Sequence, residues 1–110
     1  MKFAIPILNG EITAHFGHCE KFAVVETKDS QIISEEMITP PVHQPGVYPK
    51  FLAEQNVEVI IAGGMGQKAQ DLFAYNNIQV YLGVAKGTAS ALIENYFKDE
   101  LNTGKNLCDH

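Results

Sequence analysis

Short apolar runs separated by polar turns predict strands in the first half of the chain. The first run covers Lys2 to Leu8 and ends at Asn9-Gly10, a dipeptide typical of turns. Pro6 lacks the backbone N–H that a strand ladder uses, so we expect it near a strand end or a bulge. The runs at residues 21–27 and 31–38 are separated by only three polar residues, and they therefore predict an antiparallel hairpin.

Helical stripes alternate with apolar runs in the second half of the chain. Residues 39–49 are rich in proline and predict a loop. Apolar residues at helical spacing then predict three helices, near residues 48–55, 65–73 and 88–97. Asn76-Asn77 would end the second helix and Thr88 would cap the third. Apolar runs at residues 57–62 and 78–82 predict two further strands.

This order of elements predicts an α/β fold. The alternation of helix and strand in the second half implies right-handed crossovers and parallel strands. We therefore expect a mixed five-stranded sheet, with an antiparallel hairpin strand toward one edge and about three helices. We expect a core domain over residues 1–97 and a polar, mobile C-terminal tail over residues 98–110, which carries Cys108 and His110.

Composition and charge narrow the classes of partner. A chain of 110 residues with 45% hydrophobic residues can form a single core without disulfides. The net charge of −5 and the eight Lys and Arg residues leave no basic stripe, so we expect no nucleic-acid partner. The chain has neither a basic leader nor an apolar run of roughly 20 residues, which predicts a soluble cytoplasmic protein with reduced cysteines and no membrane partner. No exposed feature of the pattern predicts an oligomeric state.

The stretch His15-Phe16-Gly17-His18-Cys19 is the strongest candidate for metal chemistry. Two imidazoles and a thiol supply the nitrogen and sulfur donors that zinc, copper, iron or an iron–sulfur cluster prefers. Gly17 permits the tight backbone that would aim these donors inward. The spacing matches no usual zinc template, because those have two separated ligand pairs. The same stretch is also compatible with a surface turn that has two solvated histidines and a buried cysteine.

A glycine-rich loop, Gly63-Gly64-Met65-Gly66, follows the predicted strand at residues 57–62. In an open α/β sheet, ligands bind outside the carboxyl ends of the parallel strands. If the first strand is parallel to residues 57–62, the stretch from His15 to Cys19 lies at the same edge as this loop and residues 83–87. Backbone N–H groups at a glycine-rich helix start attract anions, so this edge would suit an anionic metal–sulfur species.

Other interpretations of these motifs are weaker. The glycine loop is also compatible with a simple strand-to-helix turn. Residues 64–69 match the G-x-G-x-x-G/A dinucleotide pattern, but the acidic residue expected about 20 positions later is missing, and no nucleotide P-loop motif is present. A nucleophilic Cys19 beside His15 or His18 would have no recognisable third catalytic partner, and the carboxylates are scattered. We therefore expect no enzymatic activity.

Three motifs, taken in order, give the chain a family resemblance. They are Phe3-Ala4-Ile5-Pro6, the turn from His15 to Cys19 that leads into residues 22–26, and residues 61–66 followed by Ala69. Together they resemble the dinitrogenase iron–molybdenum cofactor biosynthesis family over roughly residues 1–97. The resemblance implies a three-layer ribonuclease H-like α/β fold without nuclease activity. Nitrogenase-associated members carry iron–molybdenum cofactor or its iron–sulfur precursor, and orange proteins hold a molybdenum–copper–sulfide cluster.

The resemblance also implies ligand positions. His15 matches the family's His-Phe-Gly motif and is the first candidate ligand, and His18 is the next position of that motif. His43 lies in the proline-rich loop, where relatives often carry histidine. Cys19 stands where many relatives have a small residue, so its role as a thiolate ligand is our inference from its chemistry. Cys108-Asp109-His110 is similar to the cysteine- and histidine-bearing tails of small stand-alone members.

The glycine loop matches the family at Gly63, Gly64 and Gly66. Many relatives have Pro-Arg where Gln67-Lys68 stands here. Lys68 would keep a cationic contact to the ligand, but it lacks the bidentate geometry of arginine.

We therefore expect a non-enzymatic carrier of an iron–sulfur or iron–molybdenum-type cluster. His15 and Cys19 would be the ligands, with assistance from His18, His43 and either Cys108 or His110, while the glycine loop donates N–H bonds. Protein partners would then be cluster donors or acceptors. Two alternatives remain: a regulatory or interaction module of the same fold without a cluster, and a protein that binds a single zinc or copper ion.

Overall fold

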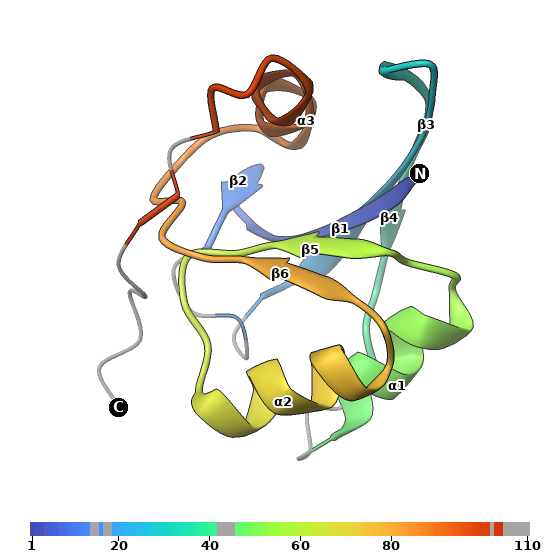
Figure 1. Cartoon of the computed structure of the whole chain (residues 1–110), viewed down its shortest axis with the longest axis vertical. Helices are drawn as coiled ribbons and strands as arrows, with labels where there is room; N and C mark the ends of the chain where they lie inside the picture. The colour runs from blue at the N-terminus through green and yellow to red at the C-terminus, as the bar shows by residue number, and fades with distance from the viewer. Residues whose placement is uncertain (14–15, 17–18, 42–45, 102, 105–110) are drawn as a thin grey trace.

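The computed structural model describes residues 1–13, 16, 19–41, 46–101 and 103–104 of the chain. Over these residues, six strands form one mixed sheet and three helices pack on its faces (Figure 1). The strands are β1 (Lys2–Leu8), β2 (Glu11–Ile12), β3 (Lys21–Lys28), β4 (Gln31–Ile38), β5 (Val59–Ile61) and β6 (Gln79–Tyr81), and the helices are α1 (Val47–Glu54), α2 (Gln67–Tyr75) and α3 (Ala89–Phe97). This confirms the predicted α/β fold, and the ribonuclease H-like label is compatible with it.

The sheet has the strand order β4-β3-β1-β5-β6. β1, β5 and β6 are parallel to one another, whereas β3 runs antiparallel to both β1 and β4. The predicted hairpin is therefore present, with β4 at one edge. The predicted count of five strands omitted β2, which pairs with the end of β1. A strand of two residues is too short to show the alternation by which strands are recognised in a sequence.

The two-residue turns of the β1–β2 hairpin and of the β3–β4 hairpin have positive φ at both residues. Asn9 and Gly10 join β1 to β2 with φ of 55° and 83°, and Asp29 and Ser30 join β3 to β4 with φ of 53° and 65°. Such turns match the right-handed twist of the flanking strands. Short polar side chains and glycine tolerate this conformation, which explains why these dipeptides close the hairpins.

Pro6 lies inside β1 and is fully buried, in register with Phe22 of β3. Its carbonyl accepts a hydrogen bond from the Thr13 amide at 3.0 Å, so the backbone polar groups of Pro6 face away from β3. On that side, β1 pairs first with β5, through Phe3 and Ala4, and later with β2. The position of Pro6 that lacks an N–H therefore faces the point along β1 where its partner strand changes from β5 to β2.

The helices divide the core into two hydrophobic clusters, one on each face of the sheet. α1 and α2 cover one face and α3 covers the other (Figure 1). Successive side chains of a strand point to opposite faces of the sheet. In β1, Phe3 and Ile5 pack on the α3 side and Ala4 packs on the opposite side. The cluster beneath α1 and α2 includes Phe16, Phe22, Tyr48, Leu52, Met65 and Phe73. No helix in the described ranges is long and apolar enough to cross a membrane.

The helix ends follow the predicted capping residues. Asn76 is the C-cap of α2, and Asn77 adopts a left-handed φ of 61°. The Thr88 side chain accepts a hydrogen bond from the Ala91 amide at 3.4 Å at the start of α3. β5 and β6 are each one or two residues shorter at both ends than the apolar runs that predicted them. The division of the chain at residue 97 stays a prediction.

Candidate functional site

The carboxyl ends of β1, β5 and β6 lie at one edge of the sheet, on the left of Figure 1. Hydrogen bonds join the loops that leave this edge. The amide of Gly83, after β6, donates to the carbonyl of Gly63, after β5, at 2.9 Å. The amide of Ile12, after β1, donates to the carbonyl of Gly87 at 3.0 Å. The glycine loop and residues 83–87, which the sequence predicted to share an edge, are therefore connected there, and β2 is bonded to the same segment.

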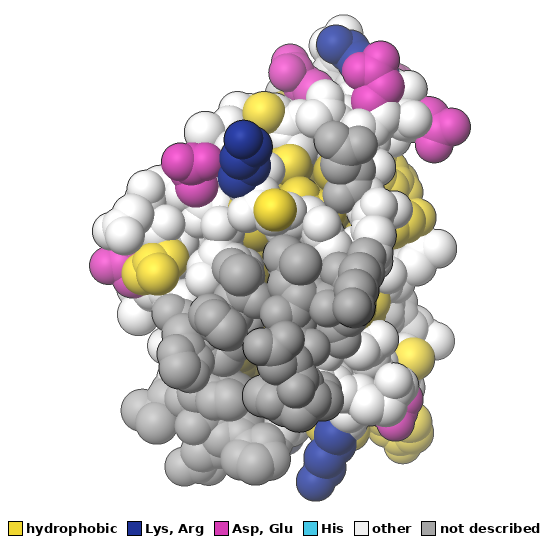
Figure 2. Space-filling model, turned by 90° about the vertical axis from the view of Figure 1, so that its left-hand side faces the viewer, with side chains coloured by type: hydrophobic (Ala, Val, Ile, Leu, Met, Phe, Trp, Pro, Cys, Tyr) yellow, Lys and Arg dark blue, Asp and Glu magenta, His cyan; other side chains and the backbone are white. Residues whose placement is uncertain are grey.

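Figure 2 shows the molecule from this side. The Asp and Glu side chains drawn in colour lie near the outline of the face rather than at its centre. The acidic side chains drawn in colour are therefore spread along the outline and do not gather into one patch on this face.

Cys19 lies two residues before the start of β3 and is half-buried. The amide of the next residue, Glu20, donates to the Ile7 carbonyl at 2.9 Å, and the Glu20 carboxylate accepts from the Asn9 amide at 3.1 Å. Both partners belong to β1 or to the turn that follows it. The backbone beside the thiol is therefore attached to the strands that form this edge.

The surroundings of Cys19 favour a neutral thiol in the metal-free protein. Burial raises the pKa of the Cys19 thiol to about 11, and a backbone hydrogen bond opposes that shift only in part. Burial also raises the pKa of Tyr48, and a nearby Cys19 thiolate would raise it further. Nucleophilic cysteines have a lowered pKa, so this environment argues against a catalytic thiol. Metal coordination would supply the positive charge that makes the thiolate stable.

Phe16 anchors the candidate ligand stretch to the core. Its side chain is 6% exposed, and its ring centroid lies 5.9 Å from Phe22, 5.4 Å from Tyr48 and 5.5 Å from Phe73. Aromatic rings prefer such tilted and edge-to-face contacts. No role for Phe16 followed from the sequence pattern. The sequence signal for its burial is a large aromatic side chain between two histidines, because such a ring is usually buried.

The glycine loop leads directly into α2. Gly63 and Gly64 are buried, and Met65 is 2% exposed. Gly66 is the N-cap of α2 and provides no side-chain hydrogen bond, and the first turn of this helix has no acidic residue. N–H groups in a first turn without a side-chain cap are suited to an anion. Lys68 lies in that turn and is exposed, where it can contribute positive charge.

Most of the predicted metal ligands lie outside the described residues. Of the described residues, no three His, Cys, Asp or Glu side chains lie close enough together to hold a metal ion. Cys19 is the predicted metal ligand that falls within the described ranges, as a free cysteine. The predicted ligands His15, His18, His43, Cys108 and His110 fall outside them. The ligand set therefore stays a prediction.

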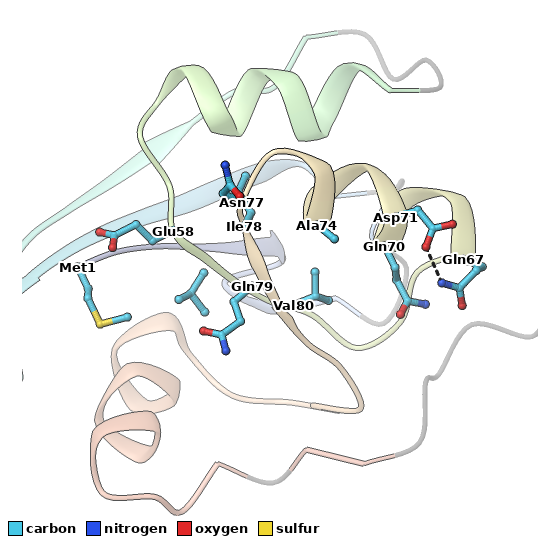
Figure 3. Close-up of a pocket in the computed structure, with 11 residues that line it drawn as sticks. Met1, Glu58, Gln67, Gln70, Asp71, Ala74, Asn77, Ile78, Gln79 and Val80 are labelled. Carbon is cyan, nitrogen blue, oxygen red and sulfur yellow. Dashed lines mark hydrogen bonds between the residues drawn. The ribbon is translucent and has the colours of Figure 1, made fainter.

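A groove of about 750 Å³ runs along β6 beside α2 (Figure 3). Its lining includes the carboxamides of Gln70, Asn77 and Gln79, and the Gln67 side chain donates to the Asp71 carboxylate at 2.9 Å. Of the described residues that line it, none is a cysteine or a histidine. This groove offers hydrogen bonds rather than soft metal ligands, and we do not assign a cluster to it.

Comparison with known proteins establishes the family. A family model described as dinitrogenase iron-molybdenum cofactor matches residues 1–99. The chain belongs to this family. An uncharacterized protein of Methanocaldococcus jannaschii, MJ0580, is 36% identical over 86 residues, which cover 74% of this chain and 73% of that protein. Membership in the dinitrogenase iron-molybdenum cofactor family confirms the resemblance seen in the motifs and relates the chain to that cofactor.

Two solved structures share the fold. PH0822 superposes with a TM-score of 0.89 over 100% of both chains, at 23% identity. The apo form of the orange protein from Desulfovibrio gigas gives a TM-score of 0.77 at 19% identity, covering 96% of this chain and 93% of that one. At identities below 25%, this similarity shows that the chains share a fold. It does not show which ligand this chain binds.

Proposed function

We propose that this protein binds and carries a metal–sulfur cluster, of the iron–sulfur or iron–molybdenum type, without catalysing a reaction. Membership in the dinitrogenase iron-molybdenum cofactor family supports a role connected with such a cofactor. The observation that carries the proposal is the position of Cys19 at the sheet edge where the glycine loop and α2 begin. A soft thiol ligand and anion-binding N–H groups would then contact the same bound cluster.

The described residues fit a cluster on chemical grounds. Metal–sulfur clusters are large and anionic, and they bind soft thiolate and imidazole donors. Cys19 supplies a thiol that packs against the cluster of apolar residues containing Met65 and Tyr48. Apolar surroundings and hydrogen bonds to sulfur both tune a bound cluster. The first turn of α2 and Lys68 supply donors and positive charge.

In this proposal His15 and Cys19 are the principal ligands. His18, His43 and either Cys108 or His110 assist, and Gly63, Gly64 and Gly66 donate backbone N–H bonds to the cluster. Lys68 adds a cationic contact. Phe16, in the middle of the ligand stretch, is buried in the core. The partners would be proteins that donate or accept the cluster.

The absence of catalysis is part of the proposal. The raised pKa of Cys19 keeps its thiol protonated near neutral pH, which is unfavourable for nucleophilic catalysis. No acidic residue lies in the first turn of α2, where an anionic ligand would bind. A carrier needs affinity and controlled release rather than stabilisation of a transition state.

Reconstitution of the purified apo protein tests this function. One sample receives ferrous iron and sulfide, and another receives cuprous copper and tetrathiomolybdate, both without oxygen. We expect visible absorbance with bound metal and stoichiometric sulfide in at least one sample, and its loss in the His15→Ala, Cys19→Ala double variant. Tyr75→Ala, at a side chain that is 84% exposed, is the control that should bind as the wild type does.

Two other results would overturn the proposal. If the reconstituted wild type absorbed no more visible light than the double variant, no cluster would be bound at the proposed ligands. Copper bound at a 1:1 ratio to protein without sulfide, or zinc at that ratio in a third sample given zinc alone, would instead indicate a single-ion site.

A further inference from the structure

The outer side of β6 presents backbone groups that do not face the sheet. β6 is an edge strand, and β5 is its paired strand in the described part of the chain. The Gln79 amide donates to the Glu58 carbonyl at 2.9 Å. The Tyr81 carbonyl accepts from the Ala62 amide, also at 2.9 Å. Because successive residues of a strand direct their backbone groups to opposite sides, the N–H and C=O of Val80 point away from β5.

The next outward position along this edge already takes part in a hydrogen bond. The Gly104 amide donates to the Leu82 carbonyl at 3.0 Å, and Leu82 directly follows β6. Exposed strand edges pair readily with other extended chains. The outer side of β6 therefore accepts a backbone hydrogen bond from a second segment just beyond Val80.

The groove of about 750 Å³ described above lies along this edge, with α2 as its second wall (Figure 3). From α2 come Gln67, Gln70, Asp71 and Ala74, whose spacing places them on one face of the helix. Gln67 and Ala74 are about 10 Å apart along the helix axis. An extended segment covers that length with about three residues, which matches the 3 residues of β6.

The carboxamide side chains of this groove suit a peptide backbone. Each carboxamide has an NH₂ donor and an oxygen acceptor, as a peptide unit has a donor and an acceptor. The Gln67 side chain donates to the Asp71 carboxylate at 2.9 Å, and the Gln70 side chain donates to the Met65 carbonyl at 3.2 Å. These bonds use the NH₂ groups and orient both side chains. The walls of the groove therefore supply polar groups beside the edge of β6.

The charge of the groove favours a cationic partner. Glu58 and Asp71 line it, and of the described residues that line it, none is Lys or Arg. The Glu58 carboxylate accepts from the Lys2 backbone amide at 3.2 Å, which does not neutralise its charge. Met1 also lines the groove, and its ammonium group donates to the Thr27 carbonyl at 2.9 Å. A second copy of this chain would bring a further net charge of −5 to an acidic groove.

We propose that this groove binds an extended segment of a partner protein that carries lysine or arginine. The segment adds to β6 as a further strand and bonds to Val80, while its cationic side chains lie near Glu58 and Asp71. In strand addition, main-chain hydrogen bonds give affinity and side-chain contacts give specificity. Gln67 follows Gly66, so one end of the groove adjoins the glycine loop. The proposal goes beyond the cluster-carrier function and does not depend on it.

Titration of the isotope-labelled apo protein with a synthetic peptide, followed by NMR, tests the groove. The probe is an acetylated and amidated peptide of alternating lysine and valine, about six residues long, the usual length of a strand. We expect the amide signals of β6 and α2 to shift and the hydrogen exchange of the Val80 amide to slow. A peptide with glutamate in place of lysine is the control and should shift these signals far less at the same concentration.

A substitution at Val80 tests the backbone pairing. Val80→Pro removes the outward N–H, and proline is tolerated at such positions of edge strands. It should weaken peptide binding about 2- to 10-fold relative to Val80→Ala, the matched control that keeps the amide. If Val80→Pro does not fold, the exchange rate of the wild-type Val80 amide with and without the peptide decides the pairing.

Substitution of the two carboxylates tests the charge preference. Glu58→Gln combined with Asp71→Asn removes both charges and keeps hydrogen-bond acceptors at both positions. We expect a loss of about 2- to 10-fold in affinity and a weaker dependence on salt. Glu35→Gln combined with Glu36→Gln makes the same change of charge on β4, at the opposite edge of the sheet, and should bind as the wild type does.

Three results would overturn the proposal. The first is a wild type whose signals do not respond to the lysine peptide. The second is a response confined to β4, which would place strand addition at the opposite edge. The third is concentration-dependent broadening of the β6 signals without peptide, which would assign the groove to a second copy of the chain. None of these measurements involves a cluster, so failure here leaves the carrier function standing, and failed reconstitution leaves this surface standing.

Discussion

The ring of Phe16 packs edge-to-face against the ring of Tyr48, with centroids 5.4 Å apart and planes at 85°. Tyr48 lies in the first turn of α1 and beside Cys19, so this contact connects the candidate ligand stretch with a helix on the same face of the sheet. Phe16 is flanked by Gly17 and His15 in the sequence. The buried aromatic side chain between the candidate ligands is therefore one that cannot itself bind metal.

Replacement of Phe16 by alanine should destabilise the protein strongly. The substitution leaves a cavity among Phe22, Tyr48 and Phe73, and buried Phe-to-Ala changes cost about 3–5 kcal/mol. Urea unfolding followed by circular dichroism measures the loss. Tyr75→Ala, at an exposed position of α2, should change the free energy of unfolding by less than about 0.5 kcal/mol. Equal stability of the two variants would contradict the anchoring role of Phe16.

Local patterns predicted most of the fold. Apolar runs located the longer strands, and short polar segments such as Asp29-Ser30 marked the hairpin, because these features depend on a few consecutive residues. The close backbone contact between Gly104 and Gly83 was not predictable in this way. It joins residues far apart in the sequence and involves only backbone atoms, which leave no pattern of side chains. The burial of Phe16 also depends on rings from three separate elements.

The positions of Cys19 and the glycine loop in the sheet were predictable, whereas the electrostatics of Cys19 were not. The rule for parallel sheets placed the glycine loop and Cys19 at one edge, and the strand directions bear this out. The raised pKa of Cys19 could not be predicted, because it arises from packing against residues of α1 and the core. Sequence alone shows a thiol, whereas burial determines its protonation state.

The thiol of Cys19 should react slowly in the apo protein. With a pKa of about 11 rather than 9.0, the thiolate fraction at pH 8 is about 100-fold smaller. Alkylation by iodoacetamide is measured in Cys108→Ser, which leaves Cys19 as the reactive cysteine. The rate should keep rising above pH 10. A plateau with an apparent pKa below 9 would contradict the buried environment.

The same shift predicts how pH affects stability. The folded state raises the Cys19 pKa, so it binds the thiol proton more tightly than the unfolded state does. The stabilisation is therefore present below about pH 9 and is lost as the pH rises toward 11. Urea unfolding of the apo protein between pH 8 and 11 should show a loss that is smaller in Cys19→Ala, and an equal loss in both would argue against the shift.

Thr88→Ala should weaken the start of α3. Loss of the N-cap side chain typically costs about 0.5–2 kcal/mol, and the 3.4 Å bond to the Ala91 amide favours the lower end of that range. Ser90→Ala, at an exposed position inside α3, is the matched control and should be neutral or slightly stabilising. Thermal unfolding compares the two variants. A Thr88→Ala variant as stable as Ser90→Ala would show that the cap contributes little.

Reversing the charge of Lys68 should weaken binding of an anionic probe. Lys68 lies in the first turn of α2, and exposed charge pairs contribute modest energies, so we expect a loss of about 2- to 10-fold in affinity for tetrathiomolybdate in Lys68→Glu. Lys98→Glu makes the same charge change just after α3 and should have a smaller effect. Added salt should reduce the difference. Equal losses in both variants would point to net charge rather than to position.

The most direct measurement is metal and acid-labile sulfide analysis of the protein purified without oxygen from cells, together with its visible spectrum. The account predicts iron or molybdenum with stoichiometric sulfide and a coloured protein. A colourless protein that contains no metal, and that gains neither metal nor sulfide on reconstitution, would contradict the carrier function and favour an interaction module of the same fold.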